Sequence, residues 1–419
     1  MNASPNLTVN TYRSHQSSLE LAAKKGTDRS RALQLMAEAL LKRQDDILEA
    51  NTLDLEASRE MAVPDLILDW LRLTPERLQI VGRALHRLSE TSDPIQQVLN
   101  IPSYQVDQCQ TYCQLMPLGV IALIYEALPE LGAIAAGLCI RTGNSLILRG
   151  SPEASHSNQA IANIIQAALE DTDLPIDCVQ LLPSEQGDLI RELVTQDQHI
   201  NLVIPYGRPQ LVQQVMRQAT APVLQTAIGN CYLYWSPTGS LDIARWMILD
   251  SYKSEPEPVN AIEKVLISRY HSPTSLTMLW NSLKEQGFEL RGDEILAAEF
   301  PEILTGTVSQ ADWGQPRLNR AIAFKSVDGL ETAITWINQY SSGHADCLAT
   351  ESYQESRQFA LGINSAMTYI NATPRFYRSP KRGSAVALGM SNQKGHRRGL
   401  ISLETLTTVR HIVQGNGIV

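Results

Sequence analysis

Thiols are the first residues in this chain that could do chemistry, because a cysteine thiolate is a strong nucleophile and a good metal ligand. The 419-residue sequence contains six of them: Cys109, Cys113, Cys139, Cys178, Cys231 and Cys347. The first two are four residues apart in a segment expected to be extended, so they share one face. A zinc or disulfide role stays open for this pair, but ordinary strand positions are the favoured interpretation. Cys139 and Cys178 have apolar neighbours and are expected in the core.

The histidines give weaker evidence for a catalytic or metal site than the cysteines do. Cys347 follows His344 by three residues, which superficially suggests a cysteine–histidine pair, but this spacing near a strand is poor geometry. Buried packing is therefore the favoured interpretation for Cys347. The eight histidines are scattered from His15 to His411 without the spacing of metal ligands, so we expect no metal site.

Arg149 and Gly150 end an apolar segment that we expect to be a strand of a parallel sheet. Ligands bind at the carboxyl edge of such sheets, so Arg149 could grip an anionic group such as a nucleotide phosphate. An exposed arginine at a strand end explains the pattern equally well. Neither a G-x-G-x-x-G run after the first expected strand nor a P-loop is present, so no standard nucleotide motif is predicted.

A basic cluster stands out because the chain as a whole is acidic, with 35 Lys and Arg against 44 Asp and Glu and a net charge of −9. The cluster consists of Arg375, Arg378, Lys381, Arg382, Lys394, Arg397 and Arg398. It suits a phosphorylated ligand or RNA, but a solvated face or a subunit contact is the more ordinary explanation. Phe376 and Tyr377 are the only aromatic residues nearby, so we expect no nucleic-acid partner.

A chain of 419 residues with 43% hydrophobic content suggests two or three domains that position these side chains. Its most apolar stretch, residues 115–140, is broken by Glu126, Pro129 and Glu130, so we expect a buried strand that leads into a helix rather than a membrane span. The first residues lack the pattern of a signal peptide, and sparse cysteines fit a reducing compartment. We therefore expect a cytoplasmic protein without a membrane partner.

Helices are expected first, followed by alternating strands and helices. Residues 15–92 have apolar positions at helical spacing, and Thr74 followed by Pro75 is typical of a helix start. Residues 104–115 are predicted to form an extended hairpin. Strands at 119–124, 145–148, 178–182 and 202–204 are then expected to alternate with helices at 130–139, 158–169 and 188–194. This alternation predicts βαβ units and a parallel sheet.

A second region is expected from about residue 241, with an apolar segment at 246–250, strands at 261–267 and 321–324, and a helix at 330–340. Residues 399–419 contain short apolar runs that suit an exchanged arm. The predicted fold class is therefore α/β, with two domains and a small extended accessory element.

Motifs along nearly the whole chain resemble those of the gamma-glutamyl phosphate reductases, which belong to the aldehyde dehydrogenase superfamily. The matching segments are residues 51–54, 72–75, 117–121, 124–127, 139–144, 147–150, 204–205, 228–231, 260, 263, 343–344, 369–372, 375–376 and 403–407. The resemblance implies an aldehyde dehydrogenase-like α/β fold. Its implied parts are a Rossmann-type NADPH-binding domain (residues 1–103 and 117–238), an α/β catalytic domain (239–385), and an oligomerisation hairpin with a tail (104–116 and 386–419).

The resemblance also implies the second step of proline synthesis. In that reaction a cysteine thiolate attacks the acyl phosphate of L-glutamyl 5-phosphate and expels phosphate; hydride from NADPH then reduces the thioester to glutamate 5-semialdehyde. The residues that the resemblance assigns to the cofactor are Arg149, Gly150, Pro205 and Gly207. A homo-oligomer is expected as well.

The sequence departs from the family pattern at the nucleophile. The family run Lys-Thr-x-Arg-Pro-Ser-x-Cys-Asn aligns without a gap on residues 252–260, which puts Val259 at the cysteine position. In the same run Tyr252 replaces the lysine, and Glu255 replaces the arginine and reverses its charge. A valine side chain has no lone pair and cannot attack an acyl phosphate.

Other charged and glycine positions are altered too. The arginine expected after Ala127 is Leu128, and the late acid of the family falls on Ala387. The Arg-Gly-Gly expected after Pro205 reads Tyr-Gly-Arg at residues 206–208. The scaffold signals are intact, so the pattern indicates a retained fold with an altered site.

Two functions follow from these observations. The first is NADPH-dependent reduction of glutamyl phosphate, which the overall resemblance favours. The second is a non-catalytic paralogue that keeps the fold and pairs with an active reductase or with glutamate 5-kinase. Cys231 is a weak candidate for a substitute nucleophile, since active members of the family commonly have a cysteine there beside the catalytic one.

Overall fold

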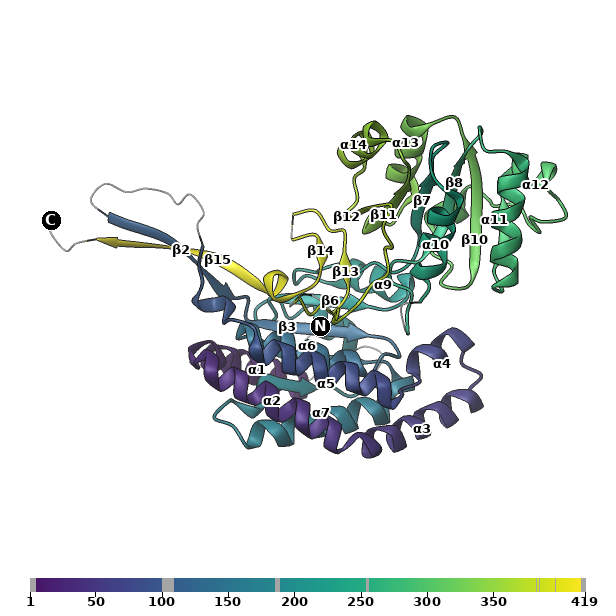
Figure 1. The fold of residues 1–419 in the computed structure, drawn as a ribbon. Coiled ribbons are helices and arrows are strands. Elements are labelled where there is room, and N and C mark those ends of the chain that lie inside the picture. The colour runs from purple at the N-terminus through teal and green to yellow at the C-terminus, as the bar shows by residue number, and fades with distance from the viewer. Residues whose placement is uncertain are drawn as a thin grey trace. The chain divides into compact units, whose positions relative to one another are not determined.

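The computed structural model divides the chain into two compact units, both drawn in Figure 1. The first unit comprises Met1–Gln225, Arg378–Leu388 and Gly395–Val419, and the second comprises Thr226–Tyr377 and Gly389–Lys394. The structure describes residues 5–99, 109–184, 189–253, 256–381, 383, 385–395 and 397–415. Among these residues, no helix combines the length and the apolar character needed to cross a bilayer.

The first unit begins with helices, as predicted for residues 15–92. They are α1 (Pro5–Ala23), α2 (Gly26–Lys42), α3 (Gln44–Glu60), α4 (Asp65–Leu71) and α5 (Pro75–Glu90). The predicted start at Thr74 is confirmed, because its side chain accepts a hydrogen bond from the backbone N–H of Arg77 and Pro75 follows directly. One apolar stripe of α5 is buried, including Leu78, Leu85 and Leu88.

A parallel sheet with the strand order β5-β4-β3-β6 forms the centre of the first unit. Its strands and their connecting helices are β3 (Val120–Tyr125), α6 (Glu130–Thr142), β4 (Ser145–Gly150), α7 (Ser155–Glu170), β5 (Val179–Leu181), α8 (Leu189–Val194), β6 (Leu202–Tyr206) and α9 (Pro209–Gln218). The predicted βαβ alternation is confirmed. Every residue of β3 and β4 is buried, which explains why these strands are continuous apolar runs.

An antiparallel sheet, β1-β2-β15, extends from the first unit and is visible in Figure 1 as a long two-stranded ribbon. Its strands are β1 (Val98–Leu99), β2 (Cys109–Pro117) and β15 (Thr407–Gly415). The predicted hairpin at residues 104–115 is found in part as β2, and residues 104–108 lie outside the described residues. The tail pairs with β2 of the same chain, Thr407 opposite Pro117 and Gly415 opposite Cys109. Two further short strands are β13 (Met390–Ser391) and β14 (Gly399–Leu400).

The second unit contains a parallel sheet with the order β12-β11-β7-β8-β10-β9. Its elements are β7 (Cys231–Trp235), α10 (Leu241–Ser251), β8 (Ile262–Ser268), α11 (Pro273–Glu285), β9 (Glu289–Gly292), α12 (Glu294–Glu299), β10 (Ala321–Val327), α13 (Leu330–Tyr340), β11 (Ala345–Ala349), α14 (Tyr353–Gly362) and β12 (Met367–Ile370). Successive side chains of β7 enter different apolar clusters, Leu233 and Trp235 one of them and Tyr232 and Tyr234 the other.

The boundaries between the units differ from the predicted ones. Residues 226–238, predicted within the cofactor domain, belong to the second unit, because β7 lies between β11 and β8 in that unit's sheet. Residues 378–385, predicted within the catalytic domain, belong to the first unit. There the backbone N–H of Ala387 donates to the carbonyl of Arg378 over 2.8 Å. Residues 98–99, also predicted within the cofactor domain, form β1 of the hairpin sheet.

Candidate functional site

Val259 lies three residues before the start of β8 in the second unit, and its side chain is fully buried. Its backbone carbonyl accepts two hydrogen bonds, from Nε2 of His344 over 2.8 Å and from the N–H of Gly229 over 2.9 Å. These contacts fix the main chain at position 259, but they give its isopropyl group no chemical function. The position where the resemblance requires a thiolate therefore holds an inert side chain in a well-defined backbone.

His344 and Ser342 lie close to Cys231. The Sγ atom of Cys231 is 3.4 Å from His344 Nε2, and Ser342 Oγ is 2.9 Å from His344 Nδ1. Burial lowers the pKa of His344 to about 4, so the ring is neutral at neutral pH. Because Nε2 carries the hydrogen that it donates to the Val259 carbonyl, it has no free lone pair for the thiol proton.

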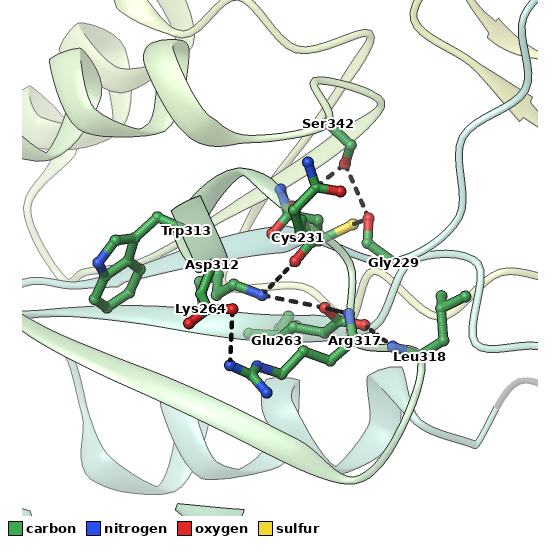
Figure 2. A network of polar contacts seen from close by, with 12 residues as sticks. Gly229, Cys231, Glu263, Lys264, Asp312, Trp313, Arg317, Leu318 and Ser342 are labelled. Atoms are coloured by element: carbon green, nitrogen blue, oxygen red, sulfur yellow. Dashed lines mark hydrogen bonds and ion pairs between the residues drawn. The ribbon is translucent and has the colours of Figure 1, made fainter. Parts of the chain in front are cut away.

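Cys231 therefore lacks the activation that a nucleophilic cysteine needs. Its side chain is fully buried, and burial raises the pKa of its thiol well above the usual value. Figure 2 shows its sulfur beside Gly229, whose carbonyl is 3.9 Å from Sγ. The geometry gives no support to Cys231, the weak candidate for a substitute nucleophile.

All six cysteines lie in the described part of the chain, and each is a free thiol. The expected core positions of Cys139 and Cys178 are confirmed, and burial raises the pKa of both thiols. Cys347 is buried as predicted, and it lies in β11, a strand that was not predicted. Cys113 is also buried, with Sγ 3.3 Å from Nδ1 of His411 in the hairpin sheet. Among the described residues no group of three or more His, Cys, Asp or Glu could hold a metal ion.

An ion pair on β8 is hydrogen-bonded to the loop that contains Arg317 and Leu318 (Figure 2). Lys264 Nζ lies 3.2 Å from Glu263 Oε2, and both side chains are fully buried. Glu263 also accepts hydrogen bonds from the backbone N–H groups of Arg317 and Leu318, over 2.7 and 2.9 Å. Sequence reasoning missed Lys264; the available signal was an adjacent acid and base inside the apolar strand predicted at 261–267.

The residues that replace the family's charged positions are packed into the fold. Tyr252 makes an edge-on contact with Phe288 at 4.8 Å between ring centroids, and burial raises the pKa of its hydroxyl well above normal. Leu128 and Ala387 are buried in the first unit. Glu255 lies outside the described residues.

The predicted cofactor residues lie at the carboxyl edge of the first unit's sheet. Arg149 and Gly150 end β4, Pro205 pairs with Ile124 of β3, and Gly207 follows β6. The interpretation of Arg149 as an exposed arginine is wrong, since only 5% of the residue is accessible. Its guanidinium donates to the carbonyls of Gly150 and Ser184, the latter over 2.9 Å.

At each of the two glycine positions of this edge, neighbouring side chains leave no room for a Cβ atom. A Cβ on Gly150 would lie 2.0 Å from Nδ2 of Asn158, whose Oδ1 accepts the Tyr125 hydroxyl over 2.9 Å. Gly207 has φ +151°, and a Cβ there would lie 2.7 Å from Oε2 of Glu126.

Glu126 and Arg208 form an ion pair at this edge, with Oε1 and Nη2 2.9 Å apart. Sequence reasoning missed the pair because its partners are 82 residues apart. Arg149 is bound to main-chain carbonyls and Glu126 to Arg208, so a nicotinamide dinucleotide that contacted these side chains would have to displace their present partners.

Several members of the basic cluster have internal partners. Arg378 is largely buried, with Nη2 3.2 Å from the Tyr206 hydroxyl, and Arg397 pairs with Glu404 at 2.7 Å. Arg375 lies over the ring of Tyr377. Arg382 lies outside the described residues.

Comparison with known proteins places these observations in a family. The sequence profile of the aldehyde dehydrogenase family matches residues 9–229. The chain is 54% identical over 390 residues to Gamma-glutamyl phosphate reductase 2 of Synechocystis sp., covering 93% of this chain and 92% of that protein. It is 36% identical to Gamma-glutamyl phosphate reductase of Gloeobacter violaceus, covering 98% and 97%. The crystal structure of Gamma-glutamyl phosphate reductase from Thermotoga maritima superposes with a TM-score of 0.89 at 30% identity and 99% coverage of both chains.

Proposed function

Because the chain belongs to the aldehyde dehydrogenase family, and within it to the gamma-glutamyl phosphate reductases, we propose that it acts at the reduction of L-glutamyl 5-phosphate in proline biosynthesis without forming the thioester itself. It is a non-catalytic member that keeps the fold and pairs with an active reductase or with glutamate 5-kinase, which makes the labile acyl phosphate. A homo-oligomer built through the β2–β15 hairpin and a cytoplasmic location belong to the same proposal, since six free thiols suit a reducing compartment.

Val259 is the observation that carries this proposal. In the family's reaction a sulfur–carbon bond forms at the acyl carbon while the carbon–oxygen bond to phosphate breaks, and hydride from NADPH later releases the aldehyde and the thiol. A valine side chain cannot form that first bond. Cys231, the candidate for a substitute nucleophile, is a buried thiol with a raised pKa. The neighbouring His344 already donates its Nε2 hydrogen to the Val259 carbonyl.

NADPH-dependent turnover of glutamyl phosphate, the first of the two functions predicted from the sequence, is the second candidate here. It is favoured by the likeness to a relative that bears the reductase name and is 54% identical over 93% of this chain. This candidate requires an opening of the site that exposes Cys231 and frees the Nε2 atom of His344.

The reverse reaction separates the two candidates. Purified full-length chain is mixed with glutamate 5-semialdehyde, phosphate and NADP, and formation of NADPH is followed by absorbance. We expect no rate from the wild type. A wild-type rate that Cys231→Ser abolishes would establish the second candidate, and a rate that survives this change would refute the requirement for a thiol at either position.

Binding experiments test the partner directly. Calorimetric titration of the chain with glutamate 5-kinase, and separately with an active reductase, is expected to give a saturable complex with one of them. If neither protein binds and the wild type shows no turnover, the proposed partnership is wrong. An unrelated enzyme of similar acidic net charge serves as the control.

A further inference from the structure

The connections that leave β3 and β6 run in opposite directions along the first unit's sheet. After β3 the chain crosses through α6 to β4, whereas after β6 it crosses through α9 to Val223, which pairs beside Val203 on the other side. In open parallel sheets, ligands bind at such a switch point, just beyond the carboxyl ends of the two strands. In this chain Glu126 follows β3, while Gly207 and Arg208 follow β6.

Glu126 and Arg208 hold each other at this switch point through several contacts. The backbone N–H of Arg208 donates to Oε2 over 2.7 Å, Nη2 donates to Oε1 over 2.9 Å, and Nε lies 3.2 and 3.3 Å from the two oxygens. The Glu126 side chain is 15% exposed and that of Arg208 is 37% exposed, so the pair is partly buried at the edge of the sheet. Hydrogen bonding to Glu126 raises the pKa of Arg208.

This pairing engages the two carboxylate oxygens that a nucleotide ribose would otherwise contact. A carboxylate beside a crevice can accept hydrogen bonds from ribose hydroxyls, but both oxygens of Glu126 already accept from Arg208. Gly207 brings the main chain into contact with the same carboxylate, as the 2.7 Å approach of its would-be Cβ to Oε2 shows. The acidic group at the switch point is therefore satisfied within the chain.

At the start of α6, on the same edge, the positive end of the helix dipole is also neutralised by a side chain of this protein. Glu130 occupies the first turn, where a helix attracts anions, and its Oε1 accepts Nε of Arg77 over 3.1 Å. Both side chains are at least 90% buried. Leu128, fully buried, stands where the resemblance places an arginine. A phosphate at this helix start would meet a buried carboxylate and an apolar side chain.

We propose that the Glu126–Arg208 ion pair closes the nucleotide crevice of the first unit, so that this chain binds nicotinamide dinucleotides weakly until the pair is broken. The inference goes beyond the missing thiol, because a chain without that thiol is still free to bind nucleotide. Position 208 is also a glycine in the family pattern that the sequence resembles, so Arg208→Gly removes the closing side chain and leaves the rest of the edge unchanged.

Fluorescence titration of NADPH and NADH against the full-length chain tests this closure without any turnover. We expect Arg208→Gly to lower the Kd about ten-fold relative to the wild type, the effect of one charge-assisted hydrogen bond that no longer competes. Arg217→Gly is the matched control, because Arg217 lies exposed in the last turn of the same helix and its loss should leave the Kd unchanged. Adding Glu126→Gln to Arg208→Gly should remove the gain.

Other outcomes overturn the inference. Equal binding by the wild type and Arg208→Gly would show that the crevice is not closed by this pair, and weaker binding by the variant would make Arg208 a phosphate ligand instead. Thermal unfolding verifies that each variant is folded, and Arg208→Lys, which keeps the charge but loses the fork, should fall between the wild type and Arg208→Gly. Tight wild-type binding without turnover would contradict this inference and leave the proposed function standing.

Discussion

His344 donates its Nε2 hydrogen to the main-chain oxygen of Val259 over 2.8 Å, across 85 residues of sequence. Gly229 donates its N–H to the same oxygen over 2.9 Å. The main chain at position 259 is thus fixed by hydrogen bonds that do not involve its side chain. The side chain can therefore be exchanged without loss of the contacts that place the backbone.

Substitutions of Val259 should separate the effect of side-chain shape on stability from the effect of burying a polar group. Val259→Cys removes little volume from a fully buried site, so we expect the free energy of unfolding to change by less than about 1.5 kcal/mol. Val259→Thr has nearly the valine shape but buries a hydroxyl, and should cost roughly 1–3 kcal/mol. Urea unfolding measures both. Equal stabilities of the two variants would mean that the threonine hydroxyl finds a partner.

His344 should make the protein sensitive to acid. Burial lowers the pKa of its imidazole from 6.5 to about 4, so the unfolded chain takes up a proton in a range where the folded chain does not. This contribution is complete above pH 6.5 and is lost as the pH falls towards about 4. His344→Gln should unfold with a melting temperature that declines less over this range. A parallel decline in variant and wild type would assign the acid sensitivity to other groups.

Asp346 should change the pH dependence of stability in the direction opposite to His344. Burial raises the pKa of its carboxyl from 3.8 to about 7, although Ser341, Ser365 and the N–H of Tyr232 donate hydrogen bonds to it. The folded chain then binds the extra proton, so stability from this group is greatest at low pH and is lost as the pH rises from 3.8 to about 7.

Asp346→Asn imitates the protonated form and should remove this dependence. Its melting temperature relative to the wild type is expected to rise between pH 4 and 7, and the reverse trend would exclude a raised pKa for Asp346. The single variants are needed because the His344 and Asp346 contributions oppose each other below pH 6.5.

Lys264 should be among the most sensitive positions of the second unit. Lys264→Met leaves the fully buried Glu263 without its cation, which typically costs about 3–5 kcal/mol. The exposed pair of Arg397 and Glu404 is the control, and Arg397→Ala should cost less than about 1 kcal/mol. Equal losses in denaturant unfolding would show that the buried pair contributes no more than a surface one.

The fold was readable from the sequence wherever burial is uniform. Residues 119–124 and 145–148 are predicted correctly as strands because both faces of β3 and β4 are covered. β11 was missed because Asp346 interrupts its short apolar run, and the serines that satisfy this carboxylate are invisible in a one-dimensional pattern.

Within the candidate sites, sequence comparison identified the altered position 259 but not its surroundings. The pairs that define those surroundings join distant residues, Glu126 with Arg208 and His344 with Val259. No local spacing encodes such contacts. The burial of Arg149 was equally beyond reach, since its pattern fits an exposed strand end and a ligand site alike.

The pairing of β15 with β2 has a consequence for the newborn protein. Residues 109–117 are synthesised long before residues 407–415, and the whole second unit is made between them. Until the later strand arrives, one edge of β2 has unpaired backbone groups, a ready template for aggregation. During translation, the β2 edge that later pairs with β15 therefore stays exposed to aggregation until the whole second unit has been made.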